Sequence, residues 1–229
     1  LNFCACHHKA KGANPIITEN SKSTNDTIRD LKIELVSDQV KEPVDLQTRG
    51  NDSNRLYISD LRGKIFIIDH NKLLPDPFLD ISRMNIAIKQ KSTPNSTSEN
   101  VLFGMAFHPD FTKNHKFYIC YRAPDDKQGL RKMVVSEFPT LSKNHNIADP
   151  ASERVVLQIH DKKLNDGTIA FGPDGFLYLN FADLNTLGGR EYAQDLTSLV
   201  GKVLRIDINK QHYGIPPDNP YSSVKNEKP

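Results

Sequence analysis

At 229 residues, with a net charge of +2, the chain can hold one large domain or two small ones. Its basic and acidic residues are interspersed, which argues against a nucleic-acid surface, because such a surface needs a concentrated basic stripe. Three cysteines, at Cys4, Cys6 and Cys120, give no disulfide framework. No apolar run approaches the roughly 18 residues that a membrane span needs.

The first 30 residues are predicted to form a polar tail or tether, and residues 31–229 the folded domain. The opening LNFCAC is similar to the end of a bacterial lipoprotein signal, with Cys4 or Cys6 as the lipidated residue. That interpretation predicts an exported protein, either a periplasmic or outer-membrane lipoprotein or a secreted one. The alternative is that the sequence simply starts at an arbitrary point.

Alternating apolar and polar residues predict a series of short strands along the rest of the chain. In chain order the predicted strands are a hairpin over 55–69 that turns at Gly63, then 116–123, 131–138, 154–159, 168–172, 176–181 and 202–208. FGPDG at 171–175 is a tight turn, and the polar run KLND before Gly167 is interpreted as a loop. Helical periodicity is weak, and the best candidate is one or two turns within 193–201.

Three strand segments repeat one form, and their tyrosines, Tyr57, Tyr118 and Tyr178, are about 60 residues apart. A β-repeat of this length suits the blades of a β-propeller, which are small antiparallel sheets arranged in a ring. Residues 31–229 have room for about three blades, whereas propellers typically have four to eight. The chain is therefore expected to form part of an all-β ring, either as a piece of a longer protein or by pairing with another chain.

Four motifs in order resemble the glucose/sorbosone dehydrogenase family: NVLFGMAFHPDF, DGTIAFGPDGFLYL, AQDLTSLVGKVLRIDI and IPPDNPY. This resemblance implies a six-bladed propeller that uses pyrroloquinoline quinone (PQQ) and calcium to oxidise aldose sugars, passing electrons to an external acceptor. The same propeller occurs in hedgehog-interacting proteins, which bind a protein ligand. Fold alone does not decide between these activities.

In the resembled family, a histidine before the FGPDG turn takes the proton from the C1 hydroxyl of the sugar while hydride passes to PQQ. An imidazole suits this task because its pKa lies near the working pH. In this sequence Leu164 stands at that position, Asn165 and Gly167 are kept, and Asp166 replaces a small residue. Leucine cannot exchange a proton, so no family catalytic residue is intact here.

The resemblance assigns cofactor contacts to Glu99, Asn165 and Asp183. Glu99 also fits an ordinary solvated loop carboxylate, and Asp183 also fits a residue that holds a turn. His160 is the one candidate for a substitute base, although a surface histidine at a strand end is the simpler interpretation. No metal ligand is assigned within this chain, because the family holds its calcium through later blades.

Three further residues are interpreted as structural. His108 follows an apolar strand and is expected to hold a turn at a blade end. Cys120 lies in an apolar run and is expected to be buried. Arg205 alternates with apolar neighbours and is expected to face outward.

The sequence leaves three hypotheses. The first is a PQQ-dependent aldose dehydrogenase, impaired by the loss of its base. The second is a non-catalytic propeller of the same family that binds carbohydrate or protein through its loop face. The third is an incompletely assembled piece with an exposed blade edge.

Overall fold

The computed structural model describes residues 33–50, 52–82, 84, 100–124, 131–161, 164–183 and 191–222. Six of these are described by their backbone alone: Asp52, Ser53, Asn165, Asp183, Glu191 and Tyr192. Residues 1–34 and 35–229 form separate units, and all the described strands belong to the second. The predicted lipidation positions Cys4 and Cys6 lie outside the described residues.

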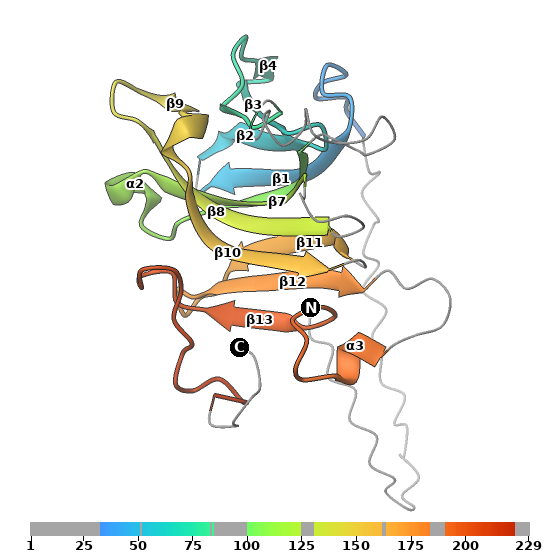
Figure 1. Cartoon of the computed structure of the whole chain (residues 1–229). Coiled ribbons are helices and arrows are strands. Elements are labelled where there is room, and N and C mark those ends of the chain that lie inside the picture. Colours follow the sequence, from blue (N-terminus) through green and yellow to red (C-terminus); the bar gives the residue numbers. More distant parts are fainter. Residues whose placement is uncertain are drawn as a thin grey trace, which may run out of the picture. The chain divides into compact units, whose positions relative to one another are not determined.

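Within the described residues, thirteen strands make three antiparallel sheets, which Figure 1 shows side by side. The first sheet contains β1 (Pro43–Arg49), β2 (Asp52–Asp60), β3 (Lys64–Asp69), β4 (Lys72–Leu73) and β5 (Leu79–Asp80). The second contains β6 (Val101–Phe107), β7 (Lys116–Ala123), β8 (Arg131–Leu141), β9 (Asn144–Ala148) and β10 (Arg154–Asp161). The third contains β11 (Leu164–Phe171), β12 (Leu177–Asp183) and β13 (Val203–Ile206).

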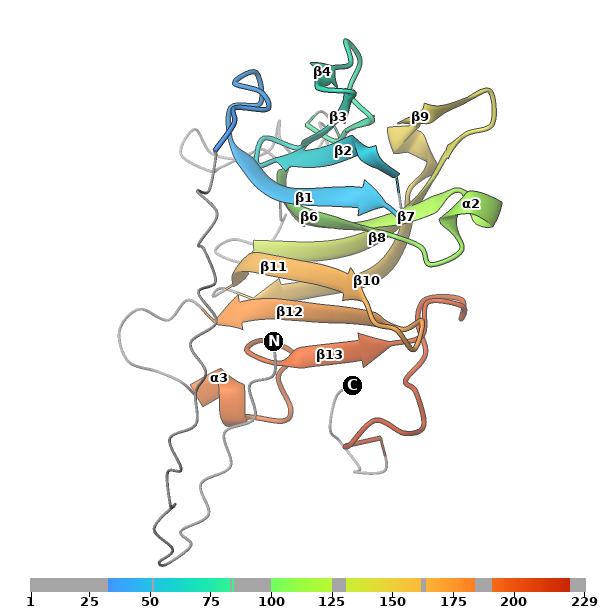
Figure 2. The same ribbon diagram turned by 180° about the vertical axis from the view of Figure 1, so that it is seen from behind.

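Each sheet is one propeller blade, and the strand order shows which strand is innermost. The orders are β1-β2-β3-β4, β6-β7-β8-β10 and β11-β12-β13. The first strands of neighbouring blades touch, β1 against β6 and β6 against β11. In Figure 2 the arrowheads of β1 and β11 point the same way. The predicted all-β, three-blade arrangement is therefore confirmed.

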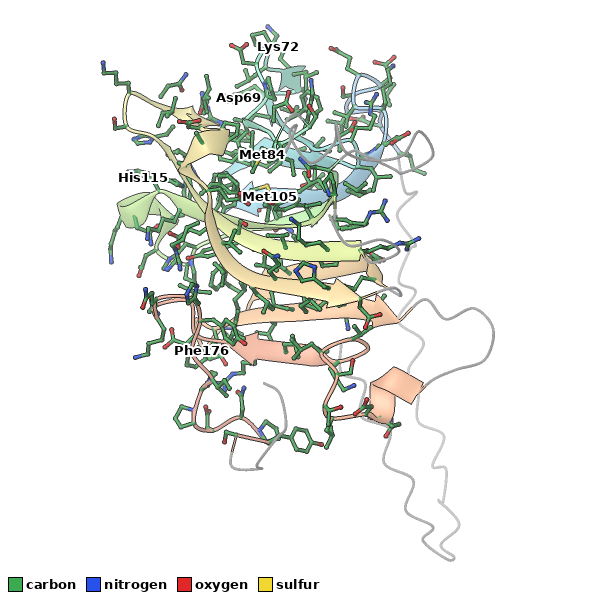
Figure 3. All side chains as sticks on the ribbon, in the orientation of Figure 1. Asp69, Lys72, Met84, Met105, His115 and Phe176 are labelled. Atoms are coloured by element: carbon green, nitrogen blue, oxygen red, sulfur yellow. The ribbon has the colours of Figure 1, made fainter. Side chains whose placement is uncertain are left out.

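Two apolar clusters fill the spaces between the blades. One joins the first and second blades, and Figure 3 labels Met105, which belongs to it, and Met84, which packs against it. The other joins the second and third blades and includes Cys120, Leu164 and Phe181. Cys120 is 0% exposed, so the predicted burial is confirmed.

The repeated tyrosines occupy matching places in the three blades. Tyr57, Tyr118 and Tyr178 each lie on the second strand of a blade. Tyr57 packs toward the second blade and Tyr118 toward the third. Tyr178 points to the opposite face from Leu177 and Leu179, which pack against the second blade, because side chains alternate along a strand. The 60-residue period is thus the period of the blade.

Most predicted strands are found, with some differences in extent. The strands β1, β4, β5 and β9 were not predicted. The strands β4 and β5 have only two residues each, and half-exposed apolar residues such as Val44 and Leu46 give β1 no continuous apolar face. The helices in the described ranges are brief: α2 (Phe111–Asn114), the 3₁₀ turn η1 (Pro150–Ser152) and α3 (Glu191–Gln194).

The helix expected within 193–201 is wrong beyond Gln194. The Asp195 carboxylate accepts hydrogen bonds from the backbone N–H and the hydroxyl of Thr197 at 2.9 and 2.6 Å. Such a local bond competes with helix formation. Gly201 then takes a φ of +77°, a left-handed conformation that favours glycine and turns the chain into β13.

The loop predicted before Gly167 is also wrong, because β11 already begins at Leu164. The register of β11 against β12 shifts between Leu164 and Gly167, which marks a β-bulge. A bulge admits an extra residue while the strand continues. The polar run KLND therefore lies partly within the innermost strand of the third blade.

Candidate functional site

The end of the blades at which β6 and β11 begin is here called the loop face. Leu164 starts β11 there, opposite Asp183 at the end of β12. Val101 starts β6 opposite Arg122 near the end of β7. The described strands on either side of residues 85–99, 125–130 and 184–190 therefore end or begin at this face. Long connections on a rigid scaffold are where propellers carry their sites.

Leu164 is fixed at this face by both its side chain and its backbone. The side chain is 0% exposed and belongs to the cluster between the second and third blades. Its carbonyl oxygen accepts a hydrogen bond from Nη1 of Arg131 at 3.1 Å. The residue is therefore a core residue of the blade interface, with no polar atom of its side chain to offer a ligand.

The space around residue 167 explains why the bulge needs a glycine there. A Cβ at this position would lie 2.7 Å from Sγ of Cys120 and 3.1 Å from Cε of Met133. Real side chains do not approach so closely without displacing a neighbour. The glycine thus permits close contact between the third blade and the second, which accounts for it without a cofactor.

The polar groups beside Gly167 have little chemical reactivity. The Asp166 carboxylate accepts the Gly167 N–H at 2.7 Å, and the residue is exposed. Burial raises the pKa of the Cys120 thiol, and the negative charge of Asp166 raises it further. Cys120 is consequently a neutral, buried thiol at physiological pH and no nucleophile.

Two arginines add positive charge to the loop face. Arg122 is half-buried, and this burial lowers its pKa. The neighbouring positive charge of Arg131 lowers the pKa further. Arginine remains charged despite such shifts. Sequence reasoning did not single out this pair, although the hairpin register, which pairs Arg122 with Met133, brings Arg122 and Arg131 to one end.

The sequence-predicted site residues are only partly brought together. Asp183 lies across from Leu164, and Asn165 follows Leu164 in β11, but their side chains are not described. Glu99 lies outside the described residues, one position before Asn100.

His160 is on β10, the outermost strand of the second blade, where it pairs with Lys132. Its Nε2 lies 2.7 Å from Nε2 of the Gln158 amide. The innermost strand of the second blade is β6, and β10 is three strands away from it. His160 is therefore at the outer edge of its blade, whereas Leu164 is on the innermost strand of the third blade.

The expectations for two structural residues can be checked directly. Nδ1 of His108 accepts the Asp110 N–H at 2.9 Å, so the predicted turn-holding role is confirmed. Arg205 lies on the outward face of β13, opposite the buried Leu204 and Ile206, as predicted, although its own contacts leave its side chain only 18% exposed. It lies 4.3 Å from the centre of the Phe176 ring, which Figure 3 labels, and pairs with Asp174 and Asp218.

Two other kinds of feature are absent from the part of the chain that the structure describes. No three His, Cys, Asp or Glu side chains gather there as they would around a metal ion. No helix in the described ranges has the length and apolar character needed to cross a membrane.

Comparison with known proteins matches residues 40–229 to the family model named Glucose / Sorbosone dehydrogenase. The chain belongs to the Glucose / Sorbosone dehydrogenase family. It is 31% identical over 212 residues to Hedgehog-interacting protein of Mus musculus, covering 87% of this chain and 29% of that protein. The chain therefore spans less than a third of that relative's length.

Solved structures of sugar dehydrogenases share the fold of this family member. The apo-form of the soluble aldose sugar dehydrogenase from Escherichia coli matches with a TM-score of 0.63 and 20% identity, over 85% of this chain and 51% of that one. The PQQ-bound form of aldose sugar dehydrogenase from Streptomyces coelicolor matches with a TM-score of 0.50 and 20% identity, over 74% and 48%. At such identities the likeness concerns the fold alone.

Proposed function

We propose that this chain contributes three blades to a non-catalytic propeller of the Glucose / Sorbosone dehydrogenase family, which binds its ligand at the loop face. The observation that carries this proposal is Leu164. It stands where the family resemblance expects the proton-accepting histidine, and its side chain is completely buried between blades. Its place in the core makes it a structural substitution, with no route for proton exchange with a bound sugar.

The described residues do not fit catalytic use of PQQ. Leu164 offers no base, and Gly167 faces the Cys120 thiol. The exposed Asp166 carboxylate would oppose an anionic cofactor, since like charges in one site disfavour each other. Arg122 and Arg131 favour an anionic group at this face, but neither accepts a proton at neutral pH. No catalytic step is therefore assigned to this chain.

A protein ligand is favoured over a small sugar for two reasons. The relative with 31% identity is named for its interaction with Hedgehog, a protein. In addition, described strands of all three blades end or begin at this one face, which suits a broad contact better than an enclosed small-molecule site.

PQQ-dependent oxidation of aldose sugars remains the second candidate, because family membership and the fold of the sugar dehydrogenases favour it. In that case Glu99, Asn165 and Asp183 would contact PQQ, calcium would be bound through other parts of the ring, and an external acceptor would take the electrons. His160 would have to act as base, although it lies on an outermost strand.

Two measurements on the folded chain test the proposal. Calorimetric titration with PQQ in the presence of calcium is expected to show no saturable binding. Immobilised chain is expected to bind a Hedgehog signalling domain, and a charge reversal at the loop face, Arg131→Glu, is expected to weaken that binding more than tenfold. Lys72→Ala, on the outer strand of the first blade, is the control (Figure 3).

Either of two results would overturn the proposal. The first is calcium-dependent PQQ binding accompanied by dye-linked sugar oxidation that His160→Ala abolishes. The second is Hedgehog-domain binding that is absent, or that Arg131→Glu leaves unchanged while circular dichroism shows an intact fold.

A further inference from the structure

A polar groove lies between the second and third blades at the end opposite the loop face. His108 follows the end of β6, and its ring centre is 5.6 Å from that of Phe171, the last residue of β11. The groove has a volume of about 550 Å³, and its lining includes His108, Lys116, Tyr118, Glu137, Arg154 and Lys210. It is independent of the loop face and of the function proposed for that face.

The floor of the groove is a row of three side chains from adjacent strands. Tyr118 on β7 and Arg154 on β10 both pair with Glu137 on β8. The Tyr118 hydroxyl donates to Oε2 of Glu137 at 2.5 Å, and Arg154 donates to both carboxylate oxygens, at 3.1 and 2.7 Å. The three groups are thus held in fixed positions by a sheet, which preorganises the groove.

The charges in this groove do not cancel. Nζ of Lys116 lies 3.0 Å from Oε1 of Glu137, so one carboxylate is shared by two cations, Lys116 and Arg154. Burial alone would raise the pKa of Glu137, but hydrogen bonds from Arg154, Tyr118 and Lys116 outweigh it and lower the pKa to about 2. Glu137 is therefore ionised at physiological pH, and the two cations with their shared carboxylate keep a net positive charge.

The rim of the groove adds two further hydrogen-bond donors, Lys210 and His108. Lys210 is exposed in the segment that follows β13. Nδ1 of His108 accepts the Asp110 N–H, so the neutral ring carries its proton on Nε2 and can donate. Burial lowers the pKa of His108, which keeps the ring neutral. The second acid in the groove is Asp110. It forms a salt bridge with Lys113, whose Nζ lies 3.6 Å from its Oδ1.

Arg154 also connects the two walls of the groove. Its Nη1 donates to the Gln211 carbonyl at 3.3 Å, and its Nη2 donates to the Ile208 carbonyl at 3.4 Å. These bonds place the 208–211 segment of the third blade against the floor provided by the second. The groove accordingly has two walls from different blades and a cationic, donor-rich lining.

We propose that this groove binds a small molecule through a single oxyanion group, a carboxylate, sulfate or phosphate. Lys116, Lys210 and Arg154 supply the charge, Nε2 of His108 and the second N–H of Arg154 Nη1 supply directed donors, and Glu137 holds the cations in place. Charge-assisted hydrogen bonds of this kind are stronger than neutral ones, and an anion replaces water in a groove that already has surplus donors.

The test is binding of four probes to the full 229-residue chain at constant ionic strength: sulfate, inorganic phosphate, glucuronate and, as a neutral control, glucose. We expect saturable binding of at least one anion and none of glucose. Lys210→Ala is expected to weaken it at least threefold and Lys116→Met at least tenfold. Lys72→Ala, on the outer strand of the first blade, is expected to change nothing.

The relative affinities identify the source of the oxyanion. Tighter binding of glucuronate than of sulfate or phosphate indicates a sugar acid, and the reverse order indicates a free inorganic anion. Absence of binding by every anion overturns the proposal. Binding that Lys116→Met and Lys210→Ala leave unchanged overturns it too, provided that circular dichroism shows both variants folded.

Discussion

Gly167 and Cys120 bring the third blade into direct contact with the second. A Cβ added to Gly167 would lie 2.7 Å from the Cys120 sulfur, inside van der Waals contact. This glycine does not have the positive φ found at four other glycines, so the reason for it is space rather than conformation. The position that resembles a cofactor loop in sequence therefore serves in the structure as a packing point between blades.

Gly167→Ala is expected to destabilise the fold by about 2 kcal/mol, a usual cost for overpacking a core. Removing the sulfur with Cys120→Ala makes room, so the same change should cost less in that background. Chemical denaturation of the four members of this cycle measures the difference. Equal costs of Gly167→Ala in both backgrounds would show that the thiol is not what excludes the methyl group.

Leu164→His is expected to lower stability by about 3 kcal/mol, because it places a polar ring in an apolar cluster without a partner. Restoring the family's histidine is therefore not expected to restore sugar oxidation. Leu164→Met, a change of similar volume, is the control and should cost less than about 1.5 kcal/mol. Dye-linked turnover with PQQ and calcium in the histidine variant, above the wild-type level, would refute this expectation.

The short apolar runs of β3 and β7 made both strands predictable from sequence, and the regular spacing of Tyr57, Tyr118 and Tyr178 did the same for the blade repeat. The run KLND was misjudged because Asn, Asp and Gly have the chemistry of turns, while the bulge in β11 depends on its pairing with β12. The family resemblance pointed to Leu164 as the residue at the histidine position. Its burial could not be predicted, because it depends on packing against the second blade. Its carbonyl's partner, Arg131, lies 33 residues away in sequence, and no local pattern reveals such a contact.

Glu137 should make stability depend on pH in the acid range. Its pKa in the folded state, about 2, is below its ordinary value of 4.5. The ionised carboxylate therefore stabilises the fold fully above about pH 4.5, and the contribution is lost as the pH falls toward 2. After allowance for solvent screening it is on the order of 2 kcal/mol.

Glu137→Gln isolates this contribution from that of other acids, such as Asp60, whose pKa is also about 2 in the folded protein. Urea denaturation at about pH 7 should show the variant less stable than wild type, and the gap should shrink by about pH 3. A gap of the same size at both pH values would mean that the carboxylate charge does not stabilise the groove.

Arg205 should secure the segment that follows β13. Its Nε donates to Asp174 at 2.9 Å and its Nη1 to Asp218 at 2.8 Å, so one guanidinium joins the FGPDG turn to residues 215–222. Lysine keeps the charge but not the planar fork, so Arg205→Lys cannot make both contacts in the same geometry. The variant should fold normally, and limited proteolysis should cut within 215–222 faster than in wild type.

Asp218→Asn, which keeps an oxygen acceptor, is the matched control and should change the cleavage rate less. If cleavage is as slow in Arg205→Lys as in wild type, the segment is held by its other bonds, among them that from Nδ2 of Asn219 to the Arg205 carbonyl at 2.9 Å.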